Sequence, residues 1–190
     1  VAAFRQGLRD LGYVEGKNMT IEYRYTEGKL DQLPGFVGEL IGLKVDVLVT
    51  IASNATLAAK NATGTIPIVF LGVTDPIGAG FVDSLARPGR NITGFTNVAA
   101  VLVGKRLELL KETLPKLSRV AVLWNPQNPG SVPQWEESQL PAQKLKLQLH
   151  SMEVSSADRF EVAFKDAIQA RSAALYVTQD VVTNSNQKQI

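Results

Sequence analysis

The amino-acid sequence predicts an α/β fold with two Rossmann-like lobes, each built on a parallel sheet. Strand-like and helix-like segments alternate along the 190 residues, which is typical of parallel sheets covered by helices. Several strand-like segments, such as 45–51 and 119–124, are almost continuously apolar, as in strands covered on both faces. The alternation begins again after Asn97, so we expect lobes at residues 1–96 and 97–190. A single doubly wound sheet of about seven strands is the alternative.

The first half of the chain begins with helical spacing and then alternates. Val1, Phe4 and Leu8 recur at the interval of one helix face. Asp31 has the position of an N-cap, and Pro34 follows in the first turn, where its missing N–H costs little. The expected helices occupy residues 1–11, 33–42, a short alanine-rich stretch after residue 53, and 77–85. The expected strands occupy residues 19–25, 45–51, 66–71 and 91–95.

The second half repeats the alternation. Val103, Leu107 and Leu110 mark a strong helix. Pro141 lies inside the next helical stretch and should kink or split it. The expected helices lie near residues 103–114, 132–146 and 160–168, and the expected strands occupy 119–124, 147–154 and 174–177.

Composition excludes several classes of function. The net charge of +2 comes from basic residues spread along the chain, so no nucleic-acid-binding surface is indicated. The absence of cysteine removes disulfides and thiolate chemistry, and His150 is the only histidine, so a zinc site is not expected. No phosphate-binding loop, dinucleotide motif or serine elbow is present, and no apolar run is long enough to span a bilayer. We therefore expect no cofactor, no metal and no enzymatic activity.

Polar residues follow the expected strands, where open α/β sheets bind their ligands. Hydroxyl, amide and carboxylate groups in these positions suit a small polar or zwitterionic ligand. The helix that begins near Ser53 could hold a carboxylate at its N-terminus, and the Asp75 carboxylate could pair with an ammonium group. The candidate ligand-binding residues are Ser53, Asn54, Ala55, Thr74, Asp75, Asn97, Asn125 and Asp180.

Several of these candidates also have a purely structural interpretation. Ser53 or Asn54 could cap the following helix, and Asp75 could cap a helix that starts at Ile77. Asn125 lies in a proline-containing loop and could serve turn formation alone. The sequence leaves both interpretations open.

The chain also contains a series of motifs in a fixed order. They include FRQGLRDLGYVEGKN at 4–18, SLARPG at 84–89, NITG at 91–94, GKRLELLK at 104–111 and VAVLWNP at 120–126, together with segments 21–24, 44–48, 65–70 and 75–76. This series resembles the ABC-transporter substrate-binding proteins of the tryptophan/tyrosine type, and the similarity covers almost the whole chain.

The resemblance implies a type I periplasmic-binding-protein fold, in which two lobes close on a ligand. The ligand would be an amino acid, in some members aromatic, or a small carboxylic acid, and the partner a membrane permease. Such proteins are periplasmic, or extracellular and lipid-anchored. By analogy the first lobe would offer Ser53, Asn54, Thr74 and Asp75, and the second Asn125 and Asp180.

Family members normally have a secretion signal and a first strand before the helix at Val1, and a longer second lobe. We therefore expect a protein truncated at both ends, lacking the first strand of the first lobe and carrying part of the second. Unpaired strand edges should make these residues fold poorly alone. Two alternatives to a transport receptor are the ligand-sensing domain of a transcription regulator or receptor and, less favoured, an α/β enzyme.

Overall fold

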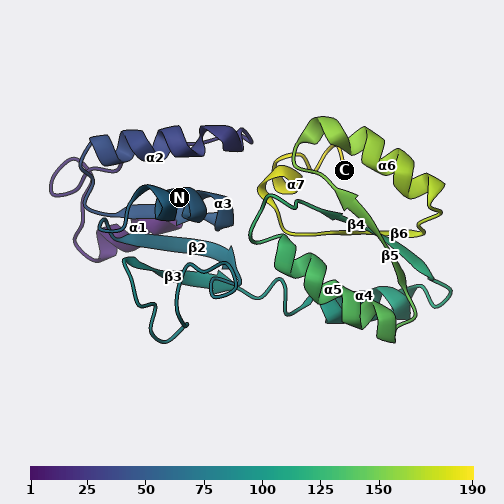
Figure 1. The fold of residues 1–190 in the computed structure, drawn as a ribbon. Helices are drawn as coiled ribbons and strands as arrows, with labels where there is room; N and C mark the ends of the chain where they lie inside the picture. The colour runs from purple at the N-terminus through teal and green to yellow at the C-terminus, as the bar shows by residue number, and fades with distance from the viewer.

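The computed structural model describes residues 1–190 and contains two separate parallel sheets (Figure 1). The first has the order β1-β2-β3 and the second the order β5-β4-β6. All neighbouring strands are parallel, so the α/β class with two Rossmann-like lobes is confirmed and the single continuous sheet is wrong. The strands are β1 (Leu48–Ile51), β2 (Ile68–Thr74), β3 (Ile92–Asn97), β4 (Arg119–Trp124), β5 (Gln148–Glu153) and β6 (Ala174–Val177).

Helices pack on the sheet of each lobe. In the first lobe α3 packs on β1 and β2, and α2 packs on α3. In the second, α4 and α5 lie on one side of the sheet and α6 on the other (Figure 1). The helices are α1 (Ala2–Asp10), α2 (Leu33–Gly42), α3 (Ala52–Ala62), α4 (Val103–Thr113), α5 (Val132–Lys144), α6 (Phe160–Gln169) and α7 (Val181–Ser185), with short 3-10 turns η1 (Leu30–Gln32) and η2 (Ala157–Arg159).

The second sheet is covered on both faces, which explains the continuous apolar run of β4. Side chains alternate between the faces of a strand. Val120 and Val122 therefore enter the core shared with α4 and α5, whereas Ala121 and Leu123 enter the core shared with α6 and α7.

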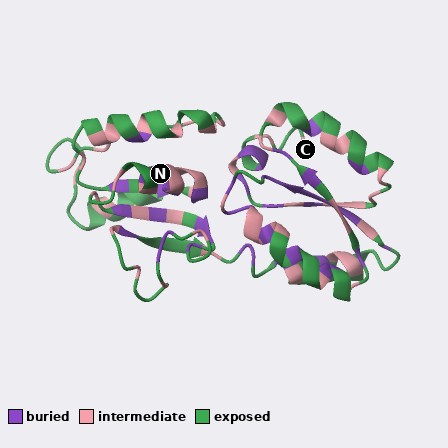
Figure 2. Ribbon diagram, viewed as in Figure 1, coloured by how far each residue is buried: buried purple, intermediate pink, exposed green.

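The first sheet has one described core, on the side of α3. Leu48 of β1 is buried there, whereas Val49 and Ile51 are 45% and 64% exposed on the opposite face. Helix α1 contributes no buried residue. Figure 2 shows this difference in burial between the two lobes.

Two expected elements of the first lobe are absent. Residues 19–25 form no strand, since apart from an isolated bridge between Glu15 and Met19 no strand pairs with this segment. Residues 77–85 form turns in place of a helix. Asp75 and Gly80 have φ of +46° and +67°, outside helical geometry, so the helical ladder is not propagated.

Three smaller expectations also require correction. Asp31 lies within η1 and is not the N-cap of α2. The N-cap position is occupied by Gln32, whose side chain makes no capping hydrogen bond. Helix α5 is not split at Pro141, and the Pro141 ring packs beside Gly104 of α4. Helix α7 was not expected, and it begins with Asp180 as its N-cap.

Candidate functional site

The carboxyl ends of the two sheets face each other across the junction between the lobes (Figure 1). Residues of the two lobes come into contact at this junction. Leu30 of η1 packs against the second-lobe core beneath α6 and α7. Ser53, at the start of α3, lies against Gly130, in the loop between β4 and α5. The polar residues expected at the strand ends are therefore near the junction.

The exit of β1 carries an unusual backbone. Ala52 follows the strand with φ of +68°, a left-handed conformation that costs a non-glycine residue about 1–2 kcal/mol. Helix α3 starts at this residue, and no side chain caps it, so neither Ser53 nor Asn54 serves as an N-cap. The first N–H groups of a helix have no intrahelical partner, and they carry the positive end of the helix dipole.

Asn54 has a buried side-chain oxygen without a hydrogen-bond partner. A buried polar atom left unpaired costs about 1–3 kcal/mol, which makes it a natural position for a ligand donor. Ser53 is 3% exposed, and Ala55 follows in the same helical turn. These three candidates form one group at the N-terminus of α3.

The ends of β2 and β3 are joined by side chains. Thr74 Oγ1 donates to Asn97 Oδ1 at 3.0 Å, and Asn97 Nδ2 donates to the Gly72 carbonyl at 2.8 Å. The Ala99 N–H also donates to Asn97 Oδ1, at 2.9 Å. Asn97 therefore fixes the start of the segment that leads to the second lobe.

Asp75 is exposed, and its side chain folds back on its own turn. The Gly78 N–H donates to Asp75 Oδ1 at 2.9 Å. This bond caps a turn, not the helix at Ile77 that the sequence suggested, and it engages one of the two carboxylate oxygens.

The second lobe contributes a buried carboxylate. Asp180 is 2% exposed, and its Oδ1 accepts from the Val182 N–H at 2.7 Å. Its Oδ2 accepts from Asn125 Nδ2 at 3.3 Å and from Asn128 Nδ2 at 2.5 Å. The structure thus brings Asn125 and Asp180 together, with both carboxylate oxygens bound to protein donors.

A second layer of buried polar residues supports this group. Ser131 Oγ accepts from the Asn125 N–H at 3.0 Å and lies 2.7 Å from Thr178 Oγ1. Gln134 Oε1 accepts from the Gln179 N–H at 2.9 Å. Sequence reasoning did not select Ser131, Gln134 or Thr178. The only available signal was their position beside the β4 and β6 strand ends.

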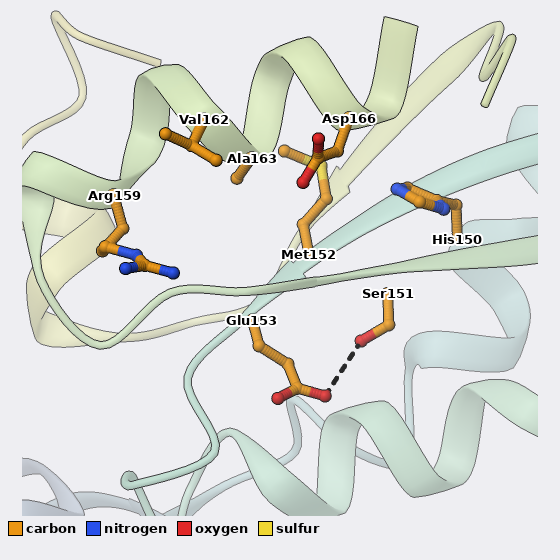
Figure 3. Close-up of a pocket in the computed structure, with 8 residues that line it drawn as sticks. All are labelled: His150, Ser151, Met152, Glu153, Arg159, Val162, Ala163 and Asp166. Atoms are coloured by element: carbon orange, nitrogen blue, oxygen red, sulfur yellow. Dashed lines mark hydrogen bonds between the residues drawn. The ribbon is translucent and has the colours of Figure 1, made fainter. Parts of the chain in front are cut away.

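Two cavities lie away from the junction. One, of about 70 Å³, is between β5 and α6 and is lined by His150, Glu153, Arg159 and Asp166 among others (Figure 3). The other, of about 150 Å³, lies beside α1 at Arg5 and Arg9. Both cavities are smaller than usual ligand pockets, which measure about 300–1,000 Å³. None of the candidate ligand-binding residues lines either cavity.

No group of three or more His, Cys, Asp or Glu side chains is arranged to hold a metal ion. None of the helices combines the length and the apolar character needed to cross a membrane.

The fold and the facing strand ends define the chain as a two-lobed α/β binding protein of the type I periplasmic class. All 190 residues match the family described as ABC transporter substrate binding protein. The chain belongs to this family. It is 29% identical over 177 residues to the tyrosine-binding protein of Clostridioides difficile strain R20291, covering 93% of this chain and 50% of that protein.

Two solved structures extend the comparison. An ABC domain from Streptococcus pneumonia in complex with L-Trp is 27% identical, with a TM-score of 0.85 over 99% of this chain and 62% of that chain. A substrate-binding protein with adhesive properties from Clostridium difficile, in a ligand-free, open structure, is 26% identical, with a TM-score of 0.59 over 99% of this chain and 63% of that chain. The chain thus spans half to two thirds of the length of these relatives.

Proposed function

We propose that this chain is the ligand-capturing part of a solute receptor of an ABC import system. Its ligand would be an amino acid, aromatic in the first instance, or a small carboxylic acid held between the lobes. The observation that carries the proposal is the N-terminus of α3, where an uncapped helix start and the unpartnered Asn54 oxygen lie beside the second-lobe loop that contains Gly130. The tyrosine-binding and L-Trp-bound relatives support the choice of ligand class.

In the proposed site the ligand carboxylate lies at the first turn of α3. The N–H groups at Ser53, Asn54 and Ala55 would receive it, because helix N-termini favour anions. The Asn54 side-chain oxygen, which has no protein partner, would accept from a ligand N–H.

The other strand ends would complete the enclosure. Asp75 would pair with the ligand ammonium through its remaining carboxylate oxygen, while Thr74 and Asn97 would shape the wall beside it. In the second lobe Asn125 would face the ligand. Asp180 would contribute by orienting the two asparagine amides that it already binds.

The lobes would meet close to the proposed boundary between residues 96 and 97. β3 ends at Asn97 and α4 begins at Val103, so the segment 98–102 would serve as a hinge. The receptor would work outside the cytoplasm, in the periplasm or lipid-anchored at the cell surface, and would deliver its ligand unchanged to a membrane permease.

Calorimetric titration with L-tyrosine, L-tryptophan and a panel of small carboxylic acids tests the proposal. Asn54→Ala should weaken binding of the preferred ligand about tenfold, which corresponds to about 1.4 kcal/mol. Asn61→Ala is the matched control, because Asn61 lies exposed near the other end of α3, and it should leave affinity unchanged. Absence of binding across the panel, or chemical turnover of a bound compound, would contradict the proposal.

A further inference from the structure

Gly130 lies so close to Ser53 that a side chain at position 130 would crowd Ser53. A β-carbon built on Gly130 would lie 2.5 Å from Ser53 Oγ, 3.3 Å from Ser53 Cβ and 3.4 Å from Asn128 Oδ1. Rotating the Ser53 hydroxyl would remove the shortest of these contacts. The approach to Ser53 Cβ would remain, and it is closer than ordinary van der Waals contact.

Backbone conformation does not explain the glycine. Gly130 is not among the residues with positive φ, so alanine could adopt its backbone geometry. The position requires a residue without a side chain, because Ser53 of the other lobe lies close to where a β-carbon would be.

Both sides of the contact are held by neighbouring groups. The Gly130 N–H donates to Asn128 Oδ1 at 2.9 Å, and its carbonyl accepts from Gln134 Nε2 at 2.8 Å. Gln134 is fully buried. On the opposite side Ser53 is buried in the first turn of α3. A methyl group added at position 130 would therefore press on Ser53 of the other lobe, and separation of the lobes would relieve this contact.

Two relatives of similar identity superpose on this chain to different extents. The chain has a TM-score of 0.85 with the L-Trp complex at 27% identity and 0.59 with the ligand-free open structure at 26% identity.

We propose that Gly130 is the closure contact of this protein: the absence of its side chain allows the second lobe to reach Ser53, and any β-carbon there holds the lobes apart. The inference rests on the proposed function for its consequence, because a receptor that cannot close encloses its ligand poorly. Gly130 acts by permitting the approach and need not touch the ligand.

Distance measurements between the lobes test the inference. The chain has no cysteine, so Asp46→Cys and Gln169→Cys, at exposed positions in the two lobes, provide a pair of fluorophore sites. The parent should populate a short distance, increasingly so with L-tyrosine or L-tryptophan. Gly130→Ala should shift the population to longer distances and weaken binding of those amino acids about tenfold, as expected when the competent population falls by that factor.

Two further variants separate closure from local damage. Gly38→Ala, on α2, adds a β-carbon that meets nothing within 4 Å and should leave the distances unchanged. Ser53→Gly combined with Gly130→Ala removes the partner of the contact and should restore the short distance, whatever Ser53→Gly does to affinity.

The outcomes are distinct. Unchanged distances in Gly130→Ala, a parent that never populates the short distance, or a double variant that stays open would each overturn the inference. If the parent closes in the absence of ligand but binds neither amino acid, the ligand assignment fails, and the distances alone decide the role of Gly130.

Discussion

Gly94 of β3 shows how one residue controls the pairing of two strands. Its φ is +159°, and an added β-carbon would lie 2.1 Å from the Phe70 carbonyl oxygen and 2.7 Å from the Phe70 ring. Gly94 is the register partner of Phe70, so the strands cannot separate locally without breaking their ladder. Gly94→Ala should therefore lower the free energy of unfolding of the first lobe by about 3 kcal/mol, combining overpacking and backbone strain, as measured by urea denaturation.

Gly64→Ala is the control for this experiment. A β-carbon at Gly64 meets nothing within 4 Å, and the residue has no positive φ. Its unfolding free energy should stay within about 0.5 kcal/mol of the parent, as for ordinary surface substitutions. A small effect of Gly94→Ala would show that β2 and β3 are less closely paired than described.

Asp180 provides a test of charge at a buried position. Its carboxylate accepts from two asparagine amides and from the Val182 N–H, so Asp180→Asn would place an amide donor against other donors. Leaving such groups unpaired costs about 1–3 kcal/mol, and we expect a loss of about 2 kcal/mol in chemical denaturation. Asp166→Asn, exposed on α6, should be neutral. Equal effects of the two substitutions would contradict the buried network.

Residue types and strand positions in the sequence are sufficient to select Asn125 and Asp180, but they do not predict that the two side chains are hydrogen-bonded to each other. The rule that ligands bind beyond strand ends selects both, and no local pattern shows that 55 positions apart they share a hydrogen bond. Ser131, Gln134 and Thr178 were missed for the same reason. Their roles depend on pairing between β4 and β6, which is tertiary information.

At the scale of elements, the hydrophobic pattern predicts a strand correctly where the folded protein also supplies neighbouring strands for it. β4 and β6 have the bounds predicted from their apolar runs, since both are buried in the second sheet. Residues 19–25 alternate like a strand, and the rings of Tyr23 and Tyr25 stack as side chains two positions apart can. A strand also needs a partner, and no sequence pattern specifies one.

The edge of β1 leads to a prediction about association. β1 ends its sheet without a neighbour on one side, and Val49 is 45% exposed. An unpaired apolar edge favours pairing with another chain, and a lysine there opposes it. The 190-residue chain should self-associate as its concentration rises, and Val49→Lys should reduce this association several-fold, as measured by light scattering after gel filtration.

A matched substitution on another surface provides the control. Val162 of α6 is 51% exposed, so Val162→Lys makes a similar change in charge and apolar area away from a strand edge. It should leave association unchanged. If both lysines suppressed association equally, net charge would be the cause and the β1 edge would not be involved.

The whole molecule has three apolar clusters, which are divided unequally between the two lobes. The first lobe buries one cluster of nine apolar residues, whereas the second buries clusters of nine and seven on opposite faces of its sheet. Leu30 contributes an apolar side chain across the junction. Because cooperativity follows shared burial, the lobes should unfold separately, and the first lobe should unfold at the lower temperature.

Calorimetry with one core substitution in each lobe tests this expectation. Ile68→Ala in β2 should lower the unfolding temperature of the first lobe alone, and Val122→Ala in β4 that of the second lobe alone. Each substitution should reduce the free energy of unfolding of its lobe by about 2–4 kcal/mol, because truncating a fully buried aliphatic side chain removes packing and leaves a cavity. Leu30→Ala should leave both cores intact and reduce the coupling between the transitions. A single transition whose calorimetric and van't Hoff enthalpies agree, shifted equally by both core substitutions, would mean that the lobes fold as one cooperative unit.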